Sequence, residues 1–244
     1  MDRFMLWVLF TSLLIIPQVI NSEEEVVKRS LINFLAQLTC NNNTDPNLNW
    51  NMSTDPCFWT GVTCDVRAMS VKKVVLDGFS FTGSFDAGSL CKAQNLNVLS
   101  FTDNKFIGDL SAEIGNCKQL THLLLSGNQF SGILPDSVSG LNNLKRLEIF
   151  NNNFSGKLPN LARISGLVSF LAENNQITGE IPSFDFSNLE YFNVSNNNFT
   201  GPVPDLKQFG FSCISGNPGL CGGPMPNACA PAPSPSTFPS VLFN

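Results

Sequence analysis

The sequence predicts an α/β solenoid of about six coils, because one phrase recurs at nearly constant spacing. The phrase is Asn-x-Phe-x-Gly-x-Leu/Ile-Pro, and each copy follows Leu-x-x-Leu-x-Leu or a close variant of it. Copies span 128–135, 152–159, 175–182 and 197–204, and looser copies start at Phe79 and Asn104. The repeats begin 25, 24, 24, 23 and 22 residues apart, at Val71, Leu96, Leu120, Leu144, Leu167 and Leu189.

Each recurring residue type has a role in the expected coil. The Leu residues point inward and stack on their counterparts. A buried Asn amide bonds backbone groups that the turn leaves open, and its loss would cost ~1–3 kcal/mol. Phe residues form a stacked spine, Gly fits a turn, and Pro fixes φ where no ladder bond is needed. The Asn column contains Asn104, Asn128, Asn152, Asn175 and Asn197, and the Phe column contains Phe81, Phe106, Phe130, Phe154 and Phe199, with Ile177 between the last two.

The N-terminal residues 1–22 are predicted to be a signal peptide. Arg3 precedes an apolar stretch over 4–20, and the small or polar Asn21 and Ser22 follow it. The alternative is a membrane anchor, but the apolar run is marginal for a bilayer core of ~30 Å. After the expected cleavage site, Val27, Leu31, Phe34 and Leu38 predict an amphipathic helix over 23–38.

Secretion makes the eight cysteines candidates for disulfides. Cys57 and Cys64 lie before the repeats, Cys221 and Cys229 lie after them, and bridges there would close both ends of the array. Cys117 falls in an apolar column, so it is expected to be a buried thiol. The partners of Cys40, Cys91 and Cys213 stay open. A zinc site is disfavoured, because no Cys-x₂-Cys pair exists and His122 is the only histidine.

Composition and motifs argue against nucleic acid and against catalysis. The net charge is −5 and no basic stripe is present, so nucleic acid is not an expected partner. No phosphate-binding Gly loop or kinase motif occurs, and His122 has no acid in an orienting position for a triad. We therefore expect no enzyme activity, no cofactor and no metal.

The expected binding surface consists of strand residues that alternate with the core Leu positions on the concave face. Three columns follow from the repeat register, and their centre combines arginine, carboxylates, aromatic rings and exposed leucines. Arg and Tyr are common binding anchors, although mixed charges on such a face can equally be solvated. The expected partner-binding residues are His122, Leu124, Arg146, Glu148, Phe150, Leu171, Glu173 and Tyr191.

The expected size of this face limits the ligand. Six strands at ~4.8 Å spacing give a length of roughly 24 Å, and the area is on the order of 400 Å². A standard interface takes ~800 Å² from each partner. A short peptide, or a share in a composite complex, is therefore expected.

Asn-x-Ser/Thr sequons are candidate glycosylation sites in a secreted chain. A glycan at the one in a concave column, Asn193, would shield Tyr191. The five sequons are Asn42, Asn51, Asn153, Asn193 and Asn198.

These motifs resemble plant-type leucine-rich repeats. The segment from Trp50 to Cys64 is similar to the N-terminal cap of plant receptor-like kinases, and 216–224 with Cys229 is similar to their C-terminal cap. The few repeats and Pro-rich tail are similar to the subfamily with short ectodomains, which includes pollen receptor-like kinases. The resemblance implies a signal peptide at 1–22, an N-terminal cap at 23–70, six repeats at 71–205, a C-terminal cap at 206–229 and a Pro-rich stalk at 230–244.

The resemblance implies an extracellular domain that binds a peptide or a partner receptor on its concave face. In the family a transmembrane helix and a kinase domain follow the stalk, and this sequence shows neither. The expected location is the cell wall or apoplast, or the plasma-membrane surface if a longer form exists. The alternatives are a free secreted binding protein or inhibitor, and a structural wall protein anchored by the Pro-rich tail.

Overall fold

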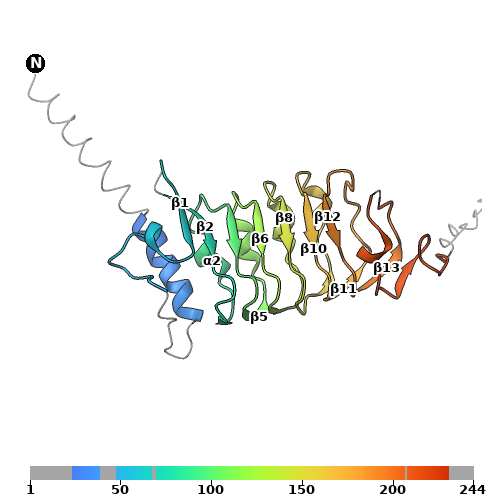
Figure 1. Ribbon diagram of the computed structural model, residues 1–244, viewed down its shortest axis with the longest axis horizontal. Coiled ribbons are helices and arrows are strands. Elements are labelled where there is room, and N and C mark those ends of the chain that lie inside the picture. Colours follow the sequence, from blue (N-terminus) through green and yellow to red (C-terminus); the bar gives the residue numbers. More distant parts are fainter. Residues whose placement is uncertain (1–23, 39–47, 68–69, 207, 231–244) are drawn as a thin grey trace, which may run out of the picture.

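The structure, a computed structural model, describes residues 24–38, 48–67, 70–206 and 208–230. Its coils stack along one long axis, with the N-terminal helix (24–38) at one end and β13 near the other (Figure 1). This arrangement confirms the predicted solenoid. The predicted signal peptide, Cys40, Asn42 and nearly all of the predicted stalk lie outside the described residues.

One face of the solenoid is a seven-stranded sheet of order β1-β2-β4-β6-β8-β10-β12. All neighbours in it are parallel except β1 and β2, which form an antiparallel pair that the sequence analysis did not predict. We number coils 1 to 6 by the strands from β2 to β12. The strands are β1 (Val62–Asp65), β2 (Ser70–Val75), β4 (Val98–Ser100), β6 (His122–Leu124), β8 (Arg146–Glu148), β10 (Ser169–Leu171) and β12 (Tyr191–Asn193).

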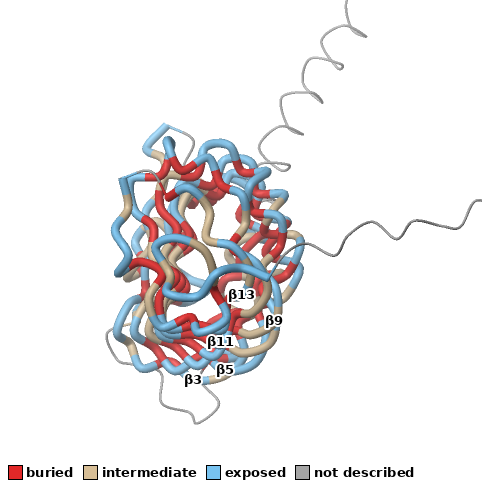
Figure 2. The backbone as a smooth tube through the Cα atoms, turned by 90° about the vertical axis from the view of Figure 1, so that its right-hand side faces the viewer, coloured by how far each residue is buried: buried red, intermediate tan, exposed pale blue. Residues whose placement is uncertain are grey.

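Two narrower parallel sheets run along the next side of the coils, which we call the lateral side. One contains β3 (Thr82–Gly83), β5 (Lys105–Asp109) and β7 (Gln129–Ser131). The other contains β9 (Ser155–Lys157), β11 (Gln176–Gly179), β13 (Asn198–Pro202) and β14 (Gly219–Cys221). Figure 2 shows the coils end-on, with buried stretches of chain alternating with exposed ones around each coil.

Short helical segments complete the coils. The segments of coils 1 to 4 (α2, η2, η3 and η4) contact one another in turn, so they stack as the strands do, whereas η1 packs against β1 and β2 and η5 packs against β12. Most are 3₁₀ turns, which suit the tight return of the chain. They are η1 (Pro56–Phe58), α2 (Ala87–Leu90), η2 (Ala112–Asn116), η3 (Asp136–Gly140), η4 (Leu161–Arg163) and η5 (Phe211–Cys213).

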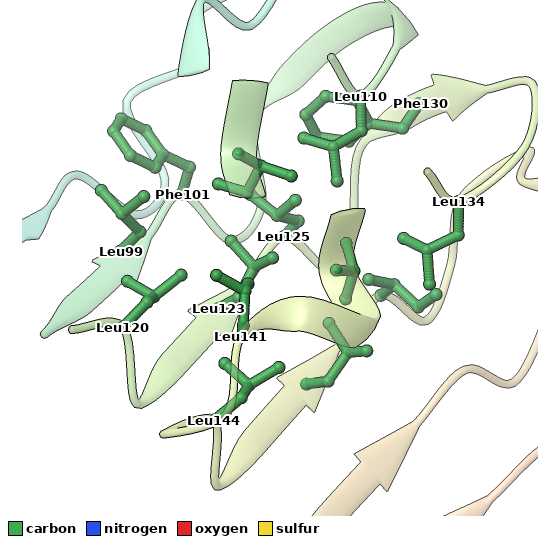
Figure 3. Close-up of a cluster of buried hydrophobic side chains, with 14 of the residues drawn as sticks. Leu99, Phe101, Leu110, Leu120, Leu123, Leu125, Phe130, Leu134, Leu141 and Leu144 are labelled. Atoms are coloured by element: carbon green, nitrogen blue, oxygen red, sulfur yellow. The ribbon is translucent and has the colours of Figure 1, made fainter. Parts of the chain in front are cut away.

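The core consists of residue columns that pass from coil to coil. Leu99, Leu123 and Leu147 are paired in register on adjacent strands and are fully buried. Figure 3 shows these layers for the middle coils, with Leu side chains from strands and turns meeting between them. The Phe spine is also present, because the ring centroids of Phe106 and Phe130 lie 5.8 Å apart in a stacked arrangement, as do those of Phe130 and the next Phe.

The Asn column joins successive coils by hydrogen bonds. Asn152 is buried, and its Oδ1 accepts a bond from Phe130 N of the preceding coil at 3.0 Å. Its Nδ2 donates to the carbonyl oxygens of Leu125 and Ile149 at 3.0 and 3.1 Å. The other members of the column, together with Asn217 in the last turn, repeat this pattern.

The N-terminal helix covers the open end of the array. Leu31 and Phe34 are fully buried, as their spacing predicts. The Phe34 ring packs edge-on against Phe85 and Phe101, with centroids 5.7 and 5.4 Å apart. Apolar surface of coils 1 and 2 that would otherwise face water is thereby buried.

The disulfides match the sequence analysis at the ends of the array but not inside it. Bridges join Cys57 to Cys64 and Cys221 to Cys229. The prediction of a free thiol at Cys117 is wrong, because Cys117 forms a disulfide with Cys91. In the repeat register, Cys117 corresponds to a residue that lies just beyond α2, so the register does not pair it with Cys91. Cys91 is the C-cap residue of α2, and its Cα lies 4.8 Å from the Cα of Cys117. Both residues are buried, so only the inference of burial was correct.

The coil pattern continues past coil 6. Val194 N donates to Cys213 O and Asn196 N donates to Ser215 O, which extends the main ladder by one more turn. Cys213 is buried and forms no disulfide within the described residues. Among the described residues, no helix has the length and apolar character that a membrane crossing requires.

Candidate functional site

The candidate site is the outward face of the seven-stranded sheet, which we call the sheet face. Strand pairing aligns its first two columns as the repeat register predicts, and backbone bonds such as Gly127 N to Phe150 O align the third. Column 1 contains Lys73, Val98, His122, Arg146, Ser169 and Tyr191; column 2 contains Val75, Ser100, Leu124, Glu148, Leu171 and Asn193; column 3 contains Asp77, Thr102, Ser126, Phe150, Glu173 and Ser195.

The structure brings all eight predicted partner-binding residues onto this face, within coils 3 to 6. His122 is the direct cross-strand neighbour of Arg146. Glu148 lies between Leu124 on one side and Leu171 on the other. The central surface therefore places charged and apolar side chains side by side.

Arg146 and Glu148 form an ion pair along one strand. Their side chains point to the same side because residues two apart share a face of a strand. Glu148 Oε1 accepts bonds from Arg146 Nε at 3.1 Å and from its terminal nitrogen at 2.7 Å. An exposed pair of this kind contributes at most ~1 kcal/mol to stability. Its main effect is to hold the guanidinium in one orientation on the face.

Glu173 belongs to column 3 and lies in coil 5, one coil beyond Glu148. Its Oε2 is shielded from water and has no hydrogen-bond partner among the described residues. Burial raises the pKa of this carboxyl, and the nearby negative charge of Glu148 adds to the increase. A backbone hydrogen bond at Glu173 opposes these effects without cancelling them. The carboxylate is thus a strong acceptor that this chain leaves partly unused.

His122 is half-buried and lies beside Arg146 on the adjacent strand. Burial lowers its pKa most, and Arg146, Lys73 and Lys145 lower it further, whereas Glu148 opposes this effect. Its Nδ1 lies 2.8 Å from Thr121 Oγ1, which fixes the ring orientation. The imidazole is therefore held mainly in its neutral form near pH 7.

The apolar part of the sheet face extends towards the C-terminal end. Leu124, Phe150 and Leu171 are half-buried, and Tyr191 is 57% exposed. Phe211 is 49% exposed and belongs to η5, which packs against β12. The sequence analysis missed Phe211, although the segment 211–217 repeats the spacing of the strand and its Asn turn.

A fourth column borders the face and was also missed. Each of its residues has a positive φ, which Gly, Asn and Asp tolerate best, and all but Gly78 directly precede a member of the Asn column. Asn174 Nδ2 donates to Asn151 Oδ1, and Asn196 Nδ2 donates to Asn174 Oδ1 at 2.8 Å. The column contains Gly78, Asp103, Gly127, Asn151, Asn174 and Asn196. Within it, the side chains of Asn151, Asn174 and Asn196 form an exposed amide ladder along one edge of the sheet face.

The sequons lie in different surroundings. Asn153 and Asn198 are exposed at the start of lateral coil segments, away from the sheet face. Asn193 is half-buried in column 2, and its Oδ1 accepts a bond from Ser195 N. The Asn51 side chain holds the cap loop through bonds to Ser53 and Thr54. Across the described residues, no group of three His, Cys, Asp or Glu side chains is placed to hold a metal ion.

Parallel strands, stacked turns and a buried Asn ladder define a leucine-rich repeat protein. The Leucine rich repeat N-terminal domain family matches 28–65, and the Leucine Rich Repeat family matches 119–141, 143–163 and 188–209. The crystal structure of a Pollen Receptor Kinase 3 is 31% identical with a TM-score of 0.70, over 82% of this chain and 99% of that one. The chain therefore belongs to the plant leucine-rich repeat receptor-like kinases and corresponds to their ectodomain, an extracellular part of these receptors.

Two further relatives place the chain within the family. Pollen receptor-like kinase 2 of Arabidopsis thaliana is 35% identical over 183 residues, which cover 74% of this chain and 28% of that protein. The chain thus spans less than a third of the length of the curated relatives it matches. The Arabidopsis receptor kinase HAESA, solved with the peptide hormone IDA and the co-receptor SERK1, is 28% identical with a TM-score of 0.51, over 62% of this chain and 30% of that one.

Proposed function

We propose that this chain is a non-catalytic recognition domain that binds a short peptide or a partner receptor on its sheet face, in the apoplast or at the plasma-membrane surface. One observation carries the proposal. Arg146, Glu148, Phe150 and Glu173 lie together in coils 4 and 5 and present charged, acceptor and aromatic groups on one surface.

The composition of this surface favours a binding role. Interfaces are enriched in Arg and aromatic residues, and their hot spots combine such anchors with hydrogen bonds. The structure of HAESA with a peptide hormone and a co-receptor shows that a related ectodomain has such partners. The small area expected for the face fits a short peptide, or a contribution to a larger complex.

The sequons are consistent with this choice of face. Glycans on Asn153 and Asn198 would stand on the lateral side of the coils, where both residues are exposed. Glycans in these two places would leave the sheet face open. We therefore propose these two residues as glycosylation sites.

A double substitution tests the function. Heptapeptides selected from a random display library against the wild-type protein should bind Arg146→Ala/Phe150→Ala about tenfold or more weakly, a loss of ~1.4 kcal/mol or more. The control Arg163→Ala removes an exposed cation from η4, outside the sheet face, and should leave binding unchanged. The melting temperature of the double variant should stay close to that of the wild type.

Two outcomes would contradict the proposal. Selected peptides that bind the double variant as tightly as the wild type would place the site elsewhere. Failure of the library to yield any peptide that depends on the folded protein would exclude peptide recognition by this chain alone.

A further inference from the structure

One of the sequons lies on the sheet face itself. Asn193 is the last residue of column 2 and the acceptor of the sequon Asn193-Val194-Ser195. Its direct cross-strand neighbour is Leu171 on β10, and Tyr191 precedes it by two residues on the same side of β12. A modification of Asn193 would therefore change the sheet face directly, which glycans on the lateral side would not.

The side-chain amide of Asn193 can carry a sugar in the folded coil. Its Oδ1 accepts a hydrogen bond from Ser195 N at 3.1 Å, so its Nδ2 points away from Ser195. This Nδ2 has no hydrogen-bond partner among the described residues, and it is not one of the sealed polar atoms that lack a partner. The nitrogen therefore reaches solvent. A sugar on it leaves the bond to Ser195 N in place, and β12 can form.

Other asparagines show the opposite arrangement. In the buried column, Asn197 Nδ2 donates to three carbonyl oxygens, and a sugar there would break these bonds. In the N-terminal cap, Asn51 belongs to a sequon, but its Nδ2 donates to Asn49 O. The amide nitrogen of Asn193 thus differs from those that hold the fold together.

The surface around Asn193 is apolar. Tyr191 and Phe211 are exposed, and Phe211 belongs to η5, which packs against β12. Leu171 is half-buried on the side of coil 5. Exposed apolar side chains that gather in one place mark a surface that is covered in function. A bulky, hydrophilic glycan attached among them would supply that cover from the same chain.

We infer that Asn193 carries an N-linked glycan and that this glycan covers the C-terminal end of the sheet face. A pyranose ring is about as wide as the spacing of neighbouring strands, ~4.8 Å, so the first sugar already shields Leu171 or Tyr191. The consequence for the ligand rests on the proposed function. A peptide binds around Arg146 and Phe150, and the glycan blocks its extension towards Tyr191.

The modification is a glycosyl transfer from a lipid-linked oligosaccharide diphosphate. A bond forms between Asn193 Nδ2 and C1 of the first sugar, and the bond between C1 and the diphosphate oxygen breaks. The lipid diphosphate leaves with the electron pair of that bond, and Nδ2 loses one proton. The Ser195 hydroxyl completes the sequon that the transfer requires.

Matched sequon variants test the site. Ser195→Ala removes the sequon at Asn193 and keeps the asparagine, and Thr200→Ala does the same for Asn198 on the lateral side. The full chain is secreted from insect cells and trimmed with an endoglycosidase that leaves one N-acetylglucosamine on each modified asparagine. Each variant should then be lighter than the wild type by one N-acetylglucosamine. Asn193→Gln keeps an amide at this position and should lose the same sugar, so a folding defect of Ser195→Ala would not decide the result.

The single tyrosine reports on the cover. Enzymatic iodination of untrimmed protein should modify Tyr191 several-fold faster in Ser195→Ala than in the wild type, because the glycan shields the phenol. Thr200→Ala should react at the wild-type rate. Heptapeptides selected against Ser195→Ala should include a group that depends on Tyr191. The glycosylated wild type should bind this group about tenfold more weakly, a loss of ~1.4 kcal/mol.

Each contrary result has a separate meaning. Equal sugar content in the trimmed wild type and in Ser195→Ala and Asn193→Gln would overturn the glycosylation site. Equal iodination rates in the wild type and Ser195→Ala, with the mass difference present, would overturn the cover. Peptides selected against the glycosylated wild type that depend on Tyr191 would also overturn the cover, and the proposed function would stand. If the sugar and the shielding are both found but neither protein yields a peptide, the glycan inference stands and the proposed function fails.

Discussion

Replacing Asn152 by Ala should destabilise the solenoid by about 2–4 kcal/mol. The substitution removes the acceptor of the Phe130 N–H, which is a buried backbone donor. A buried group left without a partner costs ~1–3 kcal/mol, and the lost donor bonds add ~0.5–1.5 kcal/mol. The carbonyls of Leu125 and Ile149 are affected less, because each also accepts a bond from a second Asn of the column, Asn128 or Asn175.

Urea unfolding followed by circular dichroism measures this loss, on protein made without glycans and with its disulfides intact. The neighbouring Asn153→Ala is the control. Asn153 is exposed and makes no side-chain hydrogen bond within the described residues, so its loss should cost less than ~0.5 kcal/mol. A loss below ~1 kcal/mol at Asn152, or equal losses at both positions, would refute the account of the Asn column.

Two further predictions concern stability. Gly127 has φ +67°, and a Cβ added there would collide with Asp103 Oδ1. Gly127→Ala should therefore lower the free energy of unfolding by ~1–2 kcal/mol in the same urea assay. The control Gly140→Ala, whose added Cβ would meet open space, should lower it much less. Because the folded-state pKa of Glu173 is raised, its contribution to stability is present at low pH and is lost as pH rises through that pKa. Glu173→Gln should therefore raise the melting temperature at pH 7 more than at pH 4, and the exposed Glu180→Gln should not. A larger gain at pH 4 would contradict the assignment.

The repeat register was sufficient to predict the columns of the sheet face. Leu123 and its counterparts fix which strand residues point inward, and alternation along the strand then places His122 and Leu124 outside. The Asn and Phe columns were predictable for the same reason, since each type recurs once in a coil. Any property that repeats with the coil is visible in the sequence.

Contacts that do not recur from one coil to the next were not predictable from the repeat register. Cys91 and Cys117 occupy different positions in their repeats, so the register alone could not pair them. The strand β1 forms by pairing with β2 and carries no repeat signal of its own. The positive-φ column was different, because Gly127 and Asn151 directly before the Asn column gave a usable signal that was overlooked.

The two ends of the array are fastened unequally. The Cys91–Cys117 bridge links coil 1 to coil 2, and the Phe34 ring contacts both coils. The Cys221–Cys229 bridge, by contrast, joins two residues only 8 positions apart in the sequence. In a linear array each coil is held only by its neighbours, so opening starts at the looser end. Amide hydrogen exchange should therefore be fastest in coil 6 and slowest in coils 1 and 2. A ligand bound across coils 3 to 6 would hinder opening at the C-terminal end. Because opening starts there and reaches coils 1 and 2 last, ligand binding would also slow amide exchange in these two coils, which the ligand does not touch.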